Sequence, residues 1–221
     1  MKKYLAEFLG TFTLIFVGEG AFLVNAISGG SLGLVGIALA QGLVLMTLIY
    51  SLIHVSGAFF NPAITVMMFI HKRIDAARSA GYIICQLGGG AAAGLLLLLL
   101  FPAATPLEHY GLPLDVDLGM GIIMEAILTF FLVATIYGVY VNRYAPKGFY
   151  GLAIGSVLIF DTLFGGPVTG AALNPARAFG PALASGIWEP QVIYWIGPII
   201  GATVASFVYE YLLTDQKKKK R

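Results

Sequence analysis

Long apolar segments alternate with short polar stretches along the whole chain. Most of these segments approach or exceed the roughly 20 residues that a helix needs to cross a hydrocarbon layer about 30 Å thick. The six apolar segments run over residues 4–26, 32–55, 80–101, 118–141, 149–164 and 192–213. The pattern predicts an all-α membrane protein with six transmembrane helices in a single domain, residues 1–221.

The composition strengthens this prediction. Hydrophobic residues make up 58% of the chain and charged residues 11%, whereas a soluble domain averages about 25% charged residues. The first apolar segment follows Lys2 and Lys3 and resembles a signal peptide. However, Glu7 and Glu19 lie inside it and five more apolar segments follow. We therefore expect this segment to remain as the first transmembrane helix.

Basic residues fall mainly on one side of such a six-helix chain. They are Lys2, Lys3, Lys72, Arg73, Arg78, Arg143, Lys147 and those of the tail at 214–221. Cytoplasmic loops of membrane proteins are enriched in Lys and Arg, so both termini are predicted to be cytoplasmic in the cell membrane. The tail is interpreted as a cytoplasmic anchor and not as a nucleic-acid-binding segment. The opposite loops carry a single basic residue, Arg177, which needs another explanation.

The chain contains two copies of one unit, over about residues 4–101 and 118–213. Three pairs of segments align: AEFLGTFTLIF from Ala6 with MEAILTFFLVA from Met124, HVSGAFFNPA from His54 with PVTGAALNPA from Pro167, and YIICQLGGGAAAG from Tyr82 with YWIGPIIGATVAS from Tyr194. Each copy holds three full spans, which is an odd number, so the second copy must enter the membrane from the opposite side. Folds with such inverted repeats place their site near the bilayer midplane, where discontinuous helices meet.

Two short apolar runs supply the discontinuous helices. Each follows an Asn-Pro-Ala motif, Asn61-Pro62-Ala63 or Asn174-Pro175-Ala176. Each run has about ten residues, or roughly 15 Å of helix, which is half the hydrocarbon thickness. Asn is a favoured N-cap and Pro suits the first helical position. The motifs therefore predict two re-entrant half-helices that meet head to head.

The paired motifs and the Ala6-Glu7-Phe8 opening resemble the aquaporin or major intrinsic protein family, and its prokaryotic type in particular. The resemblance covers the chain from about Tyr4 to Leu213. It implies a passive water channel, assembled as a homotetramer in a lipid bilayer, without enzymatic activity, catalytic residues, cofactor, metal or nucleic-acid partner. It also implies that Asn61 and Asn174 contact water at the middle of the pore.

Arg177 follows Asn174 by three residues, so it shares that helix face about 4.5 Å further toward the outer mouth. A charge inside a membrane is expensive and points to a functional site. The resemblance makes Arg177 the cation-repelling member of an outer selectivity filter. Carried over by spacing, the other members of the filter are Gln41, Thr162 and Ala171.

The filter sequence also predicts which solutes pass. Water-strict relatives usually carry an aromatic ring and a histidine where this chain has Gln41 and Thr162. The smaller side chains predict a wider, more polar ring that admits small neutral solutes such as glycerol or urea. The alternative is that Gln41 or Phe164 folds across the opening and leaves a gap of the size of water.

Four further polar residues lie in or beside the apolar segments. We expect Glu7, Glu125 and His54 to support the re-entrant loops by hydrogen bonds, because unwound backbone in a membrane must find partners. The two glutamates would instead relay protons in a secondary active transporter, the alternative function, since inverted repeats also build transporters. For Asp161, a place at the pore mouth and a place as a buried partner for backbone both remain open.

Overall fold

The computed structural model describes residues 1–102, 116–142, 145, 147–189 and 191–213. The helices are α1 (Lys2–Ile27), α2 (Gly33–Ser56), α3 (Pro62–Ile70), α4 (Ala76–Leu100), α5 (Leu118–Ile136), α6 (Tyr150–Thr169), α7 (Pro175–Ser185) and α8 (Gln191–Phe207). Two π-helical segments, η2 (Tyr137–Val141) and η3 (Val208–Leu213), extend α5 and α8. The predicted tail at 214–221 lies outside the described residues.

Six helices of the described chain are long and apolar enough to cross a membrane. They confirm the predicted all-α fold. The predicted bounds differ most for α6, which was expected to end at Phe164 but continues through Pro167 to Thr169. The proline lies in the last turn of the helix, where it removes one backbone donor and does not break the turns before it.

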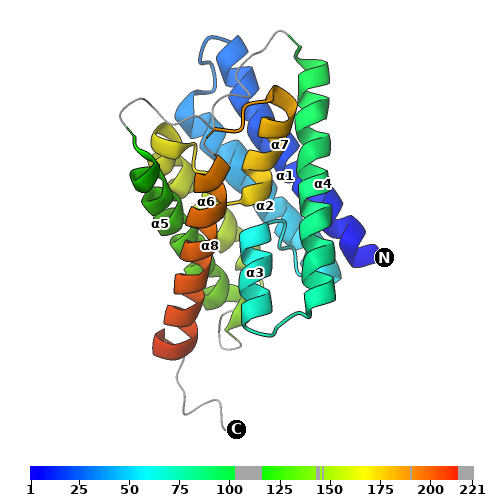
Figure 1. Ribbon diagram of the computed structural model, residues 1–221, viewed down its shortest axis with the longest axis vertical. Helices are drawn as coiled ribbons and strands as arrows, with labels where there is room; N and C mark the ends of the chain where they lie inside the picture. The colour runs from blue at the N-terminus through cyan, green and yellow to red at the C-terminus, as the bar shows by residue number, and fades with distance from the viewer. Residues whose placement is uncertain (103–115, 143–144, 146, 190, 214–221) are drawn as a thin grey trace.

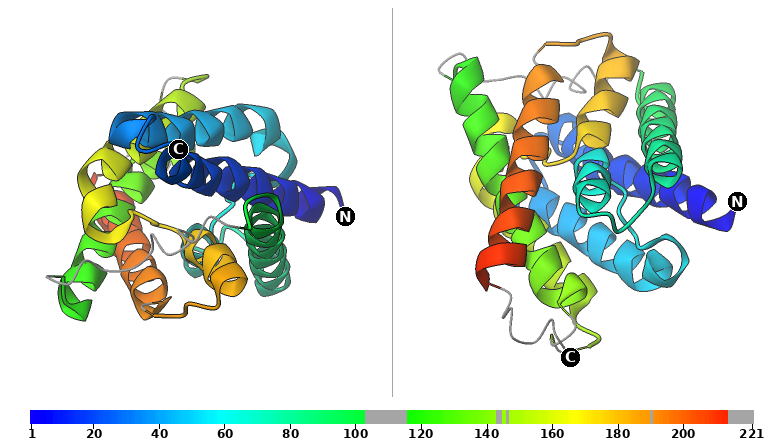
Figure 2. Two further views of the ribbon diagram at one scale, coloured as in Figure 1. Left: turned by 90° about the horizontal axis from the view of Figure 1, so that it is seen from above. Right: turned by 60° about the horizontal axis from the view of Figure 1, so that its bottom comes forward.

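The two short helices begin at the predicted motifs. Asn61 Oδ1 accepts a hydrogen bond from the backbone N–H of Ala63 at 2.8 Å, and Asn174 Oδ1 accepts one from that of Ala176 at 2.9 Å. In Figure 1, α7 lies above α3, and their starts face each other in the middle of the molecule. Figure 2 shows the long helices around this pair.

The helices pack as two equivalent halves. In the first half α1 packs along α4, and in the second half α5 packs along α8, while α2 and α6 pack against each other between the halves. Gly42 and Gly155 lie at that crossing, each nineteen residues before its motif asparagine. A Cβ on Gly42 would lie 2.5 Å from the carbonyl oxygen of Gly155, and one on Gly155 would lie 2.6 Å from that of Gly42. Only glycine at both positions permits this approach.

Candidate functional site

The backbone unwinds before each half-helix in the same conformation. After α2, the φ angles of Ala58 and Phe60 are 54° and 50°, and after α6 those of Ala171 and Leu173 are 49° and 55°. Such left-handed angles cost a residue with a side chain about 1–3 kcal/mol. The surrounding contacts must therefore hold both loops in place.

Glu7 of α1 holds the first loop. Its Oε1 accepts hydrogen bonds from Ser56 Oγ and from the backbone N–H of Phe59 at 3.1 Å, and its Oε2 accepts one from the N–H of Phe60 at 2.7 Å. Oε2 also accepts a bond from Gln86 Nε2 at 2.8 Å. All four partners are donors, so they match an ionised carboxylate.

Glu125 of α5 holds the second loop in the same way. Its Oε1 accepts hydrogen bonds from Thr169 Oγ1 at 2.6 Å and from the N–H of Ala172 at 3.0 Å, and its Oε2 accepts one from the N–H of Leu173 at 2.7 Å. The residue is fully buried. In each repeat, a glutamate on the first helix thus holds the backbone of the loop that precedes the half-helix.

The two motif asparagines connect the halves. Asn61 Nδ2 donates to the carbonyl oxygen of Leu173 at 2.9 Å, and Asn174 Nδ2 donates to that of Phe60 at 2.9 Å. Since each Oδ1 caps its own helix, each amide keeps one further N–H. The start of a helix also carries about half a positive elementary charge. Two such charges and two amide donors therefore meet at one point.

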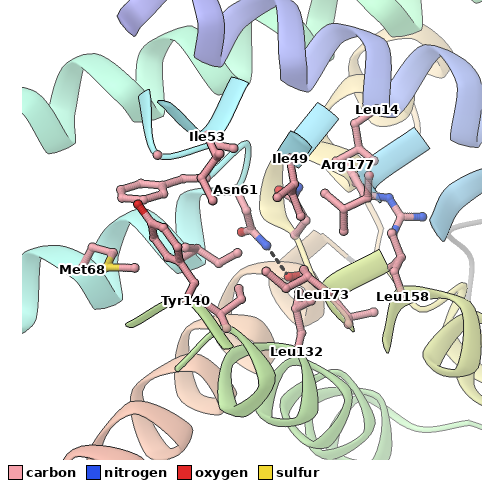
Figure 3. Close-up of a pocket in the computed structure, with 18 of the residues that line it drawn as sticks. Leu14, Ile49, Ile53, Asn61, Met68, Leu132, Tyr140, Leu158, Leu173 and Arg177 are labelled. Atoms are coloured by element: carbon pink, nitrogen blue, oxygen red, sulfur yellow. Dashed lines mark hydrogen bonds between the residues drawn. The ribbon is translucent and has the colours of Figure 1, made fainter. Parts of the chain in front are cut away.

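A narrow cavity runs past this point. Its volume is about 40 Å³, room for about three waters at the 10–15 Å³ that one water requires. Figure 3 shows Arg177 at one end, Asn61 midway and Tyr140 with Met68 at the other end. Much of the remaining lining is aliphatic, so the asparagine amides are among the few polar groups that a molecule inside the cavity can contact.

Beyond Tyr140 the cavity meets a wider vestibule of about 530 Å³. Five residues line both spaces and so lie between them: Ile53, Gly57, Phe59, Met68 and Tyr140. Tyr140 belongs to the π-helical segment η2, and such segments occur frequently at functional sites. The narrow cavity therefore has a polar end at Arg177 and a largely apolar end at Tyr140.

The structure brings the four predicted filter residues together. Arg177 Nη1 donates to the carbonyl oxygens of Ala171 and Ala172 at 3.0 Å each, and its Nη2 donates to Gln41 Oε1. Thr162 Oγ1 donates to the same Gln41 oxygen at 3.3 Å. Gln41, Thr162 and Ala171 have no exposed surface and Arg177 is 1% exposed. Hydrogen bonds therefore join the four residues into one buried cluster.

Gln41 therefore lies between Thr162 and Arg177 and bonds to both, as it would in the alternative of a side chain folded across the opening. Phe164 does not fold across it, because it is 63% exposed on the outer surface of α6. A further residue, Glu19 of α1, lies 3.5 Å from Arg177 Nη2 as an ion pair. An acidic residue within an apolar segment is the sequence feature that could have marked Glu19 as functional. The spacing of residues along the chain does not reveal that its partner is Arg177.

Two of the polar residues singled out in the sequence differ from expectation. His54 was expected to support a re-entrant loop by hydrogen bonding, but it is exposed and borders the vestibule. It forms no side-chain hydrogen bond with other described residues, because the last turn of α2 points it into open space. Asp161 neither borders the narrow cavity nor bonds to backbone. Both of its carboxylate oxygens are buried without a hydrogen-bond partner in the described chain.

Comparison with known proteins agrees with this geometry. A family model described as "MIP: Major intrinsic protein" matches residues 1–209. Aquaporin TIP4-4 from Zea mays is 39% identical over 222 residues, which cover 98% of this chain and 88% of the relative. Nodulin-26 from Glycine max is 38% identical over 217 residues, with 98% and 80% covered. The X-ray structure of the aquaglyceroporin from Plasmodium falciparum has the same fold, with a TM-score of 0.84, 24% identity and 96% of both chains covered.

These findings define first a class, the multi-pass membrane channels built from two inverted repeats. The chain belongs to the major intrinsic protein family. It is a passive channel for water and small solutes, and the transporter alternative is not favoured.

Proposed function

We propose that water crosses the membrane in single file through the cavity between Arg177 and Tyr140, and that ions and protons are excluded. The crossed pair of Asn61 and Asn174 carries this proposal. Each amide offers a donor to a passing water, while the positive helix starts on both sides oppose cations and hydronium. Arg177 adds a positive charge at the outer end.

We further propose that small neutral solutes such as glycerol or urea also pass, more slowly than water. Gln41 must then leave Arg177 and Thr162, since its oxygen accepts hydrogen bonds from both. A hydroxyl or amide group of the solute can replace these bonds while it passes. The free-energy cost of entry is therefore the difference between the hydrogen bonds that Gln41 loses and those that the solute forms. This difference is much smaller than the cost of losing either set without replacement.

Further parts of the proposal rest on the sequence. The positions of the basic residues support cytoplasmic termini in the cell membrane, and the family resemblance supports a homotetramer. The alignment supports one domain with repeats at about 4–101 and 118–213. The assignment to the prokaryotic type stays a prediction, because the two relatives compared above by sequence are plant proteins.

A coupled transporter would require a free acidic site for the coupling ion. Glu7 and Glu125, the acids that were candidates for a proton relay, each accept hydrogen bonds from a re-entrant loop. Releasing either carboxylate in every transport cycle would leave buried backbone donors without partners, at about 1–3 kcal/mol for each donor. A passive pore requires no such release.

Stopped-flow light scattering of proteoliposomes tests the proposal. We expect water flux well above that of empty vesicles, with a low activation energy and no dependence on an ion gradient, and slower glycerol or urea flux above background. Leu158→Trp should reduce water flux because Leu158 lines the cavity. Leu152→Trp on the same helix is the matched control, since Leu152 is 50% exposed on the outer surface. Water flux equal to that of empty vesicles would refute the channel.

A further inference from the structure

A carboxylate lies directly beside the filter arginine. Glu19 of α1 has no exposed surface, and its Oε1 lies 3.5 Å from Arg177 Nη2, with side-chain exposures of 2% for the arginine and 0% for the glutamate. We propose that Glu19 is a specificity-determining residue of the channel, which compensates the charge of Arg177 and thereby sets the electrostatic character of the filter. The inference rests on the proposed role of Arg177 in repelling cations.

The fold itself does not require an acid at this position. Glu19 follows Glu7 by twelve residues, and Tyr137 follows Glu125 by the same number in the second repeat. The second half therefore builds an equivalent helix with a tyrosine. An acidic residue within a membrane helix is costly, and its default interpretation is functional. Glu19 thus belongs to the features that distinguish the two halves, as Arg177 does.

The contacts of the guanidinium show how Glu19 acts. Nη1 is directed to two backbone carbonyls, those of Ala171 and Ala172. Nη2 is directed to Gln41 and to Glu19. The four acceptors fix the plane of the guanidinium, and Glu19 is the charged one among them. It therefore supplies orientation and negative charge from the side of α1.

The pair changes how the filter treats ions. An isolated arginine would present a full positive charge, whereas the Arg177–Glu19 pair presents a dipole whose potential decreases faster with distance. Removal of Arg177 alone then does more than remove repulsion. It leaves the carboxylate of Glu19, next to position 177, without its positive partner. This carboxylate then attracts protons and small cations that enter the outer end of the cavity.

A double-mutant cycle in proteoliposomes tests this consequence. Arg177→Val should raise the proton and potassium leak under an imposed potential. Adding Glu19→Gln to that variant should lower the leak by about tenfold or more, because it removes the negative charge that attracts cations; a tenfold change corresponds to about 1.4 kcal/mol. Adding Glu19→Asp to it should leave the leak high, since the charge is kept. Water flux of each variant shows that the pore has formed.

Glu19→Gln alone provides a second measurement. The filter then carries uncompensated positive charge, so nitrate flux should rise above the wild-type level while water flux is retained. If Arg177→Val fails to insert into the membrane, Glu19→Gln alone tests the role of Glu19. An unchanged nitrate flux in Glu19→Gln overturns the inference.

The outcomes separate this inference from the proposed function. Equal cation leaks in Arg177→Val with and without Glu19→Gln would show that Glu19 is only a packing residue. An unchanged leak in a water-conducting Arg177→Val variant would overturn the role of Arg177 and the inference with it. Absence of water flux in the wild type would instead overturn the channel itself.

Discussion

Replacing Glu125 by glutamine tests whether a buried carboxylate holds the second re-entrant loop. Glutamine has the same shape but only one acceptor oxygen. In the wild type, Glu125 Oε2 accepts a hydrogen bond from the backbone N–H of Leu173 at 2.7 Å. In the variant, if the glutamine oxygen accepts the hydrogen bonds from Thr169 and Ala172, its NH2 group faces that N–H and cannot accept a hydrogen bond from it. One buried donor then loses its partner, and the remaining bonds lose the assistance of the charge. The expected cost is about 2–4 kcal/mol.

The same change at Glu7 should cost more. Glu7 Oε2 accepts two hydrogen bonds, from the N–H of Phe60 and from Gln86 Nε2, whereas Glu125 Oε2 accepts one. We expect Glu7→Gln to exceed Glu125→Gln by roughly 1 kcal/mol. Both variants should also reduce water flux, because Phe60 and Leu173 carry the carbonyls to which the motif asparagines of the opposite half donate.

Thermal unfolding in detergent measures the effect. Because 1 kcal/mol corresponds to about 2–4 °C in a chain of this length, Glu125→Gln should lower the melting temperature by about 5–15 °C. Glu210→Gln is the matched control. Glu210 pairs with Arg73 near the surface at 3.0 Å, and such pairs contribute at most about 1 kcal/mol. A melting temperature for Glu125→Gln that matches that of the control would refute the holding role of Glu125.

Three further predictions concern the filter and its surroundings. Thr162→His should suppress glycerol and urea flux while sparing water, because the imidazole ring occupies the space into which Gln41 must open for a larger solute. Unchanged solute flux would show that these solutes do not pass beside residue 162. The wild type should resist mercury because Cys85 lies on α4 and is not among the residues that line the cavity. Ala171→Cys should become sensitive, and resistance despite proven labelling would show that position 171 does not border the pore. Asp161→Asn should raise the melting temperature by an amount equivalent to about 1–3 kcal/mol, since a neutral amide is cheaper to bury than a carboxylate without partners; a lower melting temperature would indicate a partner for the acid.

The half-helices and their loops could be predicted because the information is local and occurs twice. An asparagine cap followed by proline specifies the start of a helix wherever it lies, and the repeat shows that the two starts are equivalent. The alignment also paired Tyr82 with Tyr194. In the structure both hydroxyls donate at 2.8 Å to the carbonyl of the residue that ends the preceding long helix, Ser56 or Thr169.

Contacts between helices distant in sequence could not be predicted in the same way. Glu19 meets Arg177 only because α1 passes α7, and neither spacing nor the repeat contains that information. Gln86 is a second case, since it bonds to Glu7 while Pro198 occupies the equivalent position in the second half. The prediction for His54 is wrong for a related reason, because its sequence position does not show that the last turn of α2 opens onto the vestibule.

In the proposed channel the filter and the midplane oppose ions by different means, and the repeat explains the difference. At the midplane both halves contribute the same elements, a helix start and an asparagine. At the filter the halves differ, because Arg177 and Ile64 each follow their motif asparagine by three residues, and Gln41 and Ile154 each precede theirs by twenty. The proposal therefore places two barriers in series before a cation, of which only the outer one depends on Arg177 and Glu19. Substitutions at the filter should consequently change which solutes enter and raise ion leak to a limited extent, while the two helix starts continue to oppose cations at the centre.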